Sequence, residues 1–247
     1  MNFSVPPNSL KDKVILITGA GAGIGRAVAK ALALQGATII LLGKTISKLE
    51  SIYDEIEAAN CPTPAIYPMD LSGASEHDLG ALIETINTTF HRLDGIIHNA
   101  AFFEALTPFD QESAESLLKA MQVNVNTPFI ITQLALPLLK QSTTASIIFT
   151  TDSVGKIGKA YTGVYGISKF AVEGMAQILA EELEGTSVRV NRVEPMEVRS
   201  GHSSRIYPGK EIQKLAGPED ITAAYVYLMS DESQAVHGES ITADTTQ

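Results

Sequence analysis

Short apolar runs alternate with longer stretches of helical periodicity along most of this chain. The apolar runs predict buried strands at residues 14–17, 38–42, 66–70, 95–99, 146–150, 188–193 and 240–243. The stretches between them predict helices at residues 26–33, 47–59 with Ser47 as cap, 75–90, a long segment ending near 139, 163–184, and a last helix from 217. Right-handed crossovers between such strands predict an α/β fold, a Rossmann-type doubly wound parallel sheet with helices on both faces.

The alternation fills one domain. Residues 1–12 are polar and contain proline, which predicts an N-terminal tail, and residues 13–247 are predicted to form a single domain, whose binding and catalytic motifs are described below. With 247 residues, 45% of them hydrophobic, the chain can bury one large core. The polar segment around 199–214 predicts a substrate lid, with an irregular connector as the alternative.

The pattern breaks sharply between the first strand and the first helix, where glycines recur. Glycine lets the backbone reverse and leaves N–H groups pointing outward at the positive end of the helix, where a phosphate can bind. A turn with no ligand is the alternative, but the strand before it and the helix after it favour a nucleotide. The turn therefore predicts a dinucleotide pyrophosphate site at Gly19, Gly21, Ala22, Gly23, Ile24 and Gly25.

Charge and composition narrow the classes of partner. The net charge of -10 argues against nucleic acid and anionic membranes, which attract basic surfaces. There is no apolar stretch of about twenty residues and no secretory signal pattern at the start. The single cysteine, Cys61, cannot form an internal disulfide, so we expect a cytoplasmic protein. The five histidines lack metal-ligand spacing, and no metal is expected.

The glycine spacing resembles the Thr-Gly-x-x-x-Gly-x-Gly motif of the short-chain dehydrogenase/reductase family. Three later segments continue the resemblance in the family's order: His98-Asn99-Ala100-Ala101, Val123-Asn124-Val125 and Tyr165-Gly166-Ile167-Ser168-Lys169. Together they span nearly the whole chain. The resemblance implies an oxidoreductase that transfers a hydride between a nicotinamide cofactor and a carbonyl or alcohol substrate.

The expected chemistry centres on Tyr165 and Lys169. A spacing of four on a helix places the two side chains on one face, where the ammonium favours the phenolate. A phenol with a pKa near ~10 is a poor base at neutral pH without such help. We therefore expect Tyr165 to be the general acid/base. Lys169 would lower its pKa and, by the resemblance, hold the ribose.

The resemblance implies two further catalytic residues. Pro128 lacks an N–H and clashes with the Asn124 carbonyl, so the helix should bend there, where the family has an asparagine that holds a relay water. The family's serine, which hydrogen-bonds the substrate carbonyl, lies about thirteen residues before the tyrosine, and that count gives Asp152. Because a hydroxyl suits the developing negative charge and a carboxylate opposes it, Ser153 is the predicted residue.

The end of the second strand bears on the cofactor. A carboxylate there would bind the ribose hydroxyls of NAD and repel a 2′-phosphate, but the chain has Gly43 followed by Lys44. We therefore predict NADP(H) in preference to NAD(H), with a solvated surface lysine as the alternative role for Lys44. The resemblance implies further cofactor contacts at Asp70, where a turn or cap is the alternative, and at Leu71, Asn99, Ala100, Pro195, Val198 and Ser200.

Departures from the family's pattern keep other functions open. Ala101, Asp152 and Met196, which stands where the family has glycine, are compatible with a catalytically weak or inactive NADP(H)-binding module or a scaffold protein. An apolar substrate is expected from apolar residues in segments near the site, which could equally be core: Phe102, Phe103, Ile157, Tyr161, Met196 and Tyr207. A homodimer or homotetramer is expected because the helix at 163–184 is apolar around much of its circumference, at Ile167, Phe170, Val172, Met175, Ile178 and Leu179.

Overall fold

A computed structural model of the chain describes residues 3–200, 203–206 and 209–243. Within these residues, seven parallel strands form one sheet in the order β3-β2-β1-β4-β5-β6-β7. The strands are β1 (Val14–Thr18), β2 (Thr38–Gly43), β3 (Ala65–Pro68), β4 (Gly95–His98), β5 (Ala145–Thr150), β6 (Val188–Glu194) and β7 (Ser240–Thr242). The predicted doubly wound fold is confirmed.

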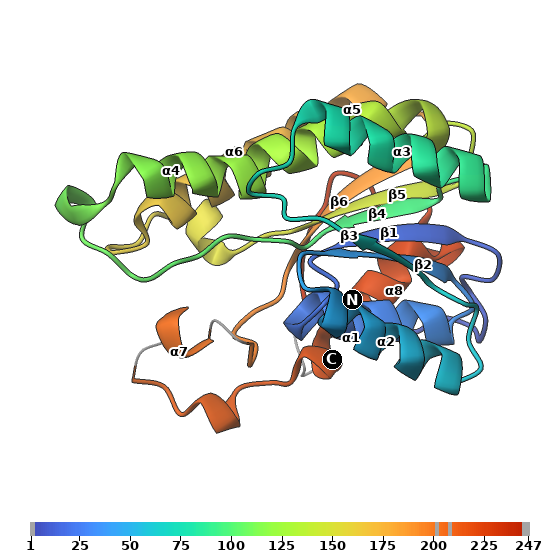
Figure 1. Cartoon of the computed structure of the whole chain (residues 1–247), viewed down its shortest axis with the longest axis horizontal. Coiled ribbons are helices and arrows are strands. Elements are labelled where there is room, and N and C mark those ends of the chain that lie inside the picture. Colours follow the sequence, from blue (N-terminus) through green and yellow to red (C-terminus); the bar gives the residue numbers. More distant parts are fainter. Residues whose placement is uncertain (1–2, 201–202, 207–208, 244–247) are drawn as a thin grey trace.

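Helices cover both faces of the sheet (Figure 1). One layer holds α1 (Gly23–Leu34), α2 (Ile46–Ala58) and α8 (Thr222–Met229), and the other holds α3 (Glu76–Phe90), α4 (Ala114–Met121), α5 (Thr127–Leu139) and α6 (Gly163–Leu183). Successive strand side chains point to opposite faces, so Ile15 and Ile17 join the core under α1 while Leu16 joins the core under α3. Burial on both faces explains why the central strands are apolar throughout.

Two boundaries differ from the predicted ones. The second helix begins at Ile46 with Thr45 at its N-cap, two residues before the predicted cap Ser47. Its first turn carries Leu49, which is fully buried in the core. The predicted tail is anchored at its end: Leu10 is buried in the core and its N–H donates to the Gln35 carbonyl at 3.0 Å. The domain therefore includes the last residues of that segment.

The long helical stretch before β5 is interrupted where Asn124 lies. A π-helical turn (Gln122–Asn126) separates α4 from α5, and the Thr127 N–H bonds the Gln122 carbonyl. Pro128 follows in the first turn of α5. A π turn inserts an extra residue into a helix, and such turns occur often at functional sites. This π turn lies where the sequence predicted a bend.

The segment between β6 and α8 leaves the layered body and returns. It holds the short helix α7 (Ser203–Ile206), which Figure 1 shows away from the sheet, and the 3-10 turn η4 (Ile212–Lys214). Val198 and Ala216 pair at the base of this excursion. Tyr207, expected near the substrate, lies outside the described residues.

Only part of the apolar surface predicted on α6 is exposed. Val172 is buried within the chain's own core, and Met175 and Leu179 pack against that core. Ile167, Phe170 and Ile178 face outward. The expectation that all of these side chains meet another subunit is therefore corrected.

Candidate active site

The glycine turn between β1 and α1 can accept an anion. Gly19 and Gly23 have φ of +68° and +54°, a region that disfavours other L-residues. A Cβ on Gly19 would lie 2.9 Å from the Ala100 Cα, and one on Gly25 would collide with the Gly19 carbonyl. Ala22, at the N-cap of α1, offers no side-chain cap, and the first turn has no acidic residue. The turn therefore fits a dinucleotide pyrophosphate.

Thr18 and Asn99 hold this turn against the end of β4. The Thr18 Oγ1 accepts hydrogen bonds from the N–H groups of Asn99 and Ala100, both at 3.1 Å. The Asn99 Nδ2 donates to the carbonyls of Thr18 and Gly19 at 3.3 and 3.4 Å. Asn99 thus holds the glycine turn in place through hydrogen bonds to its carbonyls. Thr18, which the sequence analysis did not name as a site residue, has a structural role in the motif.

Two lysines lie near the end of β2. Lys44 is exposed, and the Lys48 Cβ lies 3.3 Å from the position of a Cβ on Gly21. Lys48 was not singled out by the sequence analysis; it lies in the first turn of α2. The Asp70 Oδ1 accepts from the Ser72 N–H and hydroxyl, and these bonds, with a smaller contribution from Lys44, lower the pKa of Asp70.

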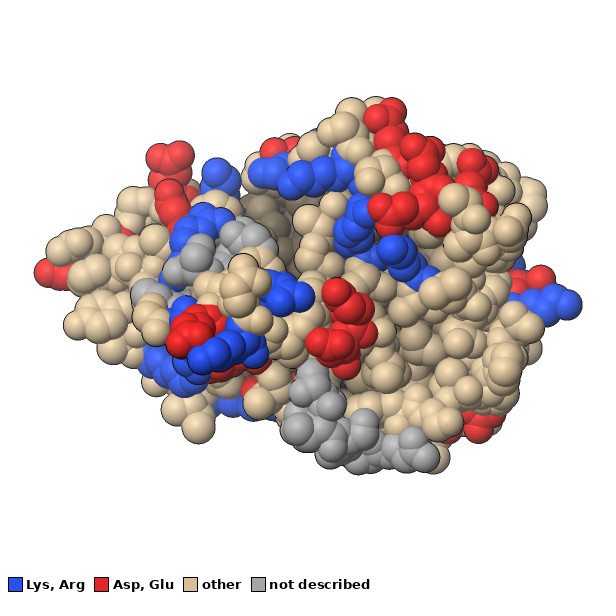
Figure 2. All heavy atoms as spheres, turned by 90° about the horizontal axis from the view of Figure 1, so that it is seen from below, with Lys and Arg blue, Asp and Glu red and all other residues tan. Residues whose placement is uncertain are grey.

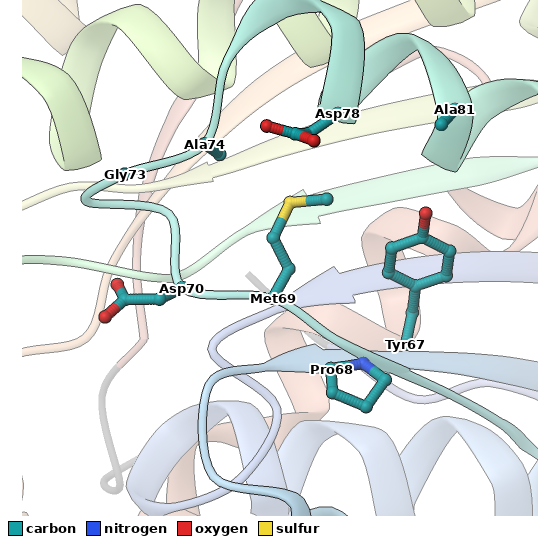
Figure 3. Close-up of a pocket in the computed structure, with 8 residues that line it drawn as sticks. All are labelled: Tyr67, Pro68, Met69, Asp70, Gly73, Ala74, Asp78 and Ala81. Carbon is teal, nitrogen blue, oxygen red and sulfur yellow. The ribbon is translucent and has the colours of Figure 1, made fainter.

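A hollow of about 450 Å³ opens beside Asp70 (Figure 3). Its lining comes from the end of β3 and from α3: Tyr67, Pro68, Met69, Asp70, Gly73, Ala74, Asp78 and Ala81. It shares no residue with the Tyr165 region. Leu71, a predicted cofactor contact, has its side chain buried in the core, so only its backbone is available to a ligand.

Tyr165 stands at the start of α6 against Asp152. The Tyr165 hydroxyl donates to the Asp152 Oδ2 at 3.0 Å, and its ring meets the Phe103 ring edge-on with 5.2 Å between centroids. The Lys169 Nζ lies 5.5 Å from the Tyr165 ring centroid and donates to the carbonyl of Thr150, the last residue of β5, at 2.9 Å. The predicted pair is therefore brought together at the carboxyl edge of the sheet.

Lys169 is buried, and its charge is balanced by carboxylates. Burial lowers the pKa of Lys169, while Asp152 and Glu173 act in the opposite direction. A buried ammonium costs free energy unless anions or carbonyls compensate it. Asp152 thus acts electrostatically on both members of the Tyr165–Lys169 pair.

The structure corrects the choice of Ser153 over Asp152. The carboxylate of Asp152 occupies the position against the Tyr165 hydroxyl. The Ser153 hydroxyl donates to the Asp152 Oδ1 at 3.4 Å and accepts from the Lys159 Nζ at 3.3 Å. Asp152 is the N-cap of the 3-10 turn η3 (Ser153–Gly155), and this cap geometry directs its second oxygen toward Tyr165.

Asn124 lies in the π turn, and the side chain is fully engaged. Its Oδ1 accepts from the Phe102 N–H at 2.6 Å, and its Nδ2 donates to the Phe102 carbonyl and to the Ser168 Oγ. Ser168 lies on α6 between Tyr165 and Lys169. Asn124 therefore joins the loop after β4 to the helix that carries the predicted acid/base.

A glycine turn after β1 and a Tyr-x-x-x-Lys pair at the start of α6 accompany a strong match to a known family. The family model described as short chain dehydrogenase matches residues 13–211. The chain belongs to this family. It is an NAD(P)-dependent oxidoreductase.

Individual short chain dehydrogenases match along their full length. The uncharacterized oxidoreductase YciK of Escherichia coli K12 is 38% identical, over 96% of this chain and 94% of that protein. A short chain dehydrogenase structure from Pseudomonas syringae is 42% identical with a TM-score of 0.94, covering 99% of this chain and 100% of that one. A Shigella flexneri 2a structure complexed with NADP is 37% identical with a TM-score of 0.93, covering 96% and 99%.

In this short chain dehydrogenase, residues of the segment after β6 lie close to the glycine turn. Ser200 lies beside Gly23, 3.7 Å from the position of a Cβ there, and Val198 is buried beneath. Pro195 is half-buried directly after β6, where the resemblance places a cofactor contact. Met196 has φ of +49°, a conformation that favours glycine, which explains the family's preference at this position.

The apolar residues predicted near the substrate differ in their relation to Tyr165. Phe103 is buried against it, whereas Ile157, Tyr161 and Met196 are exposed. Phe102 lies under the Lys119 ammonium, 4.9 Å from its ring centroid. These residues are available to an apolar part of a substrate.

The charged surface of this short chain dehydrogenase is mixed. Figure 2 shows Lys and Arg side chains interspersed with Asp and Glu on one face, with no continuous basic area. In the described part of the chain, no cluster of His, Cys, Asp or Glu could hold a metal ion. Nor does any helix there have the length and apolarity to span a membrane.

Proposed function

We propose that this protein is an NADP(H)-dependent oxidoreductase that interconverts a carbonyl and an alcohol, with Tyr165 as general acid/base. The observation that carries the proposal is the placement of Tyr165 and Lys169. Lys169 is tied to the last residue of β5, which sets Tyr165 at the sheet edge where the glycine turn also opens. Ligands of open α/β sheets bind at that edge.

In the reduction direction Tyr165 gives a proton to the carbonyl oxygen. NADPH, when bound, supplies the hydride that the carbonyl carbon gains. Lys169 holds a positive charge beside the phenol, which favours proton release. The Asn124 side chain is occupied by Phe102 and Ser168. We therefore assign the relay water to its main-chain carbonyl, because Pro128, four residues on, has no N–H to donate to it.

The catalytic test is Tyr165→Phe, measured as NADPH consumption on a panel of ketones. We expect turnover to fall about 10²–10⁴-fold, the usual contribution of a positioned general acid. NADPH affinity should stay unchanged, because the glycine turn is untouched. Full turnover by this variant would remove the acid/base role.

The cofactor test is a fluorescence titration with NADPH and NADH. Gly43, Lys44 and Lys48 leave no carboxylate at the end of β2 to repel a 2′-phosphate, and the NADP complex of the Shigella flexneri relative supports the same preference. We expect tighter binding of NADPH, and Lys44→Ser should reduce its advantage over NADH by about tenfold, or ~1.4 kcal/mol. Lys140→Ser, which removes an exposed lysine at the end of α5, is the control. Tighter NADH binding by the unaltered protein would reverse the assignment.

A cofactor-binding protein without catalysis is the second candidate. Asp152 favours it, because a carboxylate beside Tyr165 opposes negative charge on a substrate oxygen. Tight NADPH binding with no turnover on the ketone panel would support this function. Turnover abolished by Tyr165→Phe would exclude it.

A further inference from the structure

The Asp152 carboxylate is a charged group of the site that the proposed function does not use. Its Oδ2 accepts from the Tyr165 hydroxyl at 3.0 Å, and its Oδ1 accepts from the Val154 N–H at 3.1 Å. Asp152 is half-buried. Among the described residues its contacts are hydrogen bonds and longer-range attraction to Lys169, with no ion pair within 4.0 Å.

Two lysines near Asp152 are committed to other groups. The Lys169 Nζ bonds the Thr150 carbonyl, and the Lys159 Nζ bonds the Ser153 hydroxyl. A partly buried carboxylate without a direct counter-ion is stabilised when a cation binds it. Neither lysine is hydrogen-bonded to the Asp152 carboxylate, so its oxygens can accept from a cationic donor that enters with the substrate.

A neutral ketone fits this charge pattern poorly. Its oxygen would take the Tyr165 proton as a hydrogen bond, and Asp152 would lose that donor while facing an oxygen that becomes more negative as reduction proceeds. A carbonyl oxygen has no hydrogen to offer in return. Binding would leave the carboxylate with one hydrogen bond fewer and a repulsive neighbour.

We propose that the substrate carries a protonated amine on the carbon next to the reacting carbonyl or hydroxyl carbon. This inference rests on the proposed function. The nitrogen and oxygen of such a molecule lie about as far apart as the Asp152 Oδ2 and Tyr165 Oη, which are 3.0 Å apart. The ammonium donates to Asp152 in place of the phenol, and its charge offsets the negative charge that grows on the substrate oxygen.

The surrounding side chains describe the rest of the substrate. Phe103 is buried against the Tyr165 ring. Ile157 and Tyr161 precede Tyr165 by a few residues in sequence, and both side chains are exposed. These residues favour an apolar or aromatic substituent on the far side of the carbonyl. The expected substrate class is an α-amino ketone, or the matching 1,2-amino alcohol, with an apolar remainder.

The test compares two ketones of equal size, 2-amino-1-phenylethanone and 1-phenylpropan-1-one, which differ by an ammonium in place of a methyl group. With NADPH at neutral pH, we expect kcat/KM to favour the amino ketone by about tenfold or more, as for a charge-assisted hydrogen bond. Asp152→Ser and Asp152→Asn should abolish or reverse the ratio. Serine retains the capping group for the Val154 N–H. Glu181→Ser, which removes an exposed carboxylate far along α6, should leave the ratio unchanged.

Binding provides a second readout. The matched alcohols 2-amino-1-phenylethanol and 1-phenylpropan-1-ol are titrated into the protein–NADPH complex, with cofactor fluorescence as the signal. A preference for the amino alcohol that Asp152→Ser removes supports the inference. Equal binding, or a neutral ketone preferred in turnover, overturns it while leaving the proposed function intact. Selective amine binding without turnover of any ketone overturns the proposed function instead.

Discussion

Buried polar side chains distinguish this chain at the scale of single residues. His98 lies on β4 beneath the site, with its Nε2 2.8 Å from the Thr132 Oγ1 and its ring stacked on Phe149. Its Nδ1 is one of the buried polar atoms without a partner among the described residues. Burial lowers the pKa of His98 to about 3. These contacts give His98 a local packing role, since a neutral buried imidazole is not a proton carrier near pH 7.

His98 should make the protein sensitive to acid. The unfolded chain binds the His98 proton below a pKa of about 6.5, and the folded chain binds it only near 3, so stability falls as pH decreases between these values. At pH 5 the loss is ~2 kcal/mol. We expect His98→Asn to reduce the difference in free energy of unfolding between pH 7 and pH 5 by that amount, measured by urea denaturation. His77→Asn, at an exposed position, is the control, and equal differences in both variants would contradict the assignment.

At the scale of elements, the turn between β1 and α1 shows what glycine contributes at each position. Gly25 is required for close packing, because a Cβ would collide with the Gly19 carbonyl. A Cβ on Gly23 would meet only the Ser200 Cβ, at an ordinary contact distance of 3.7 Å, but the φ of +54° disfavours a side chain. Gly80, inside α3, has neither constraint: no atom lies within 4 Å of a Cβ there. The same substitution should therefore have opposite effects at these positions.

We expect Gly23→Ala to weaken NADPH binding about tenfold or more and to destabilise the fold by ~1–2 kcal/mol, the cost of a left-handed conformation for alanine. Gly80→Ala should stabilise the protein by ~0.5–1 kcal/mol through helix propensity and leave NADPH binding unchanged. Fluorescence titration and thermal denaturation measure both effects. A Gly23→Ala variant with normal affinity would show that the turn does not hold the cofactor.

At the scale of the whole molecule, one helical layer holds most of the exposed large apolar side chains that the described α-helices carry, the others being Leu34 on α1 and Ile46 on α2. Its exposed large side chains are Leu118 on α4, Phe129 on α5, and Ile167, Phe170 and Ile178 on α6. All belong to the layer opposite α1 and α2 (Figure 1). Apolar residues gathered on one layer are typical of surfaces that bind another chain.

We expect the protein to form a homo-oligomer through this layer. Phe170→Glu places a charge on the α6 surface, and light scattering at micromolar concentration should then give a smaller mass than that of the unaltered protein. Leu34→Glu, at an exposed position on α1 in the other layer, should leave the mass unchanged. A monomeric mass for the unaltered protein would contradict the expectation.

Local signals carried most of the fold and part of the site. Strand runs, the helix that begins after Ser75 and the glycine turn depend on residues close together in sequence, and they lie within a few positions of where they were expected. Side-chain partners across the fold were less predictable. The engagement of Asn124 with Phe102 and the burial of Leu71 depend on how separate loops pack, which periodicity does not report.

The sequence by itself determined the alternation of strands and helices, the anion-accepting turn and the pairing of Tyr165 with Lys169, because each follows from spacing along one element. Only the tertiary structure decided that Asp152, and not Ser153, meets the Tyr165 hydroxyl. That contact joins the residues after β5 to α6. A shift of one residue in the turn η3 would change which side chain faces Tyr165. Local sequence cannot determine this register, because it depends on the packing of two elements against each other.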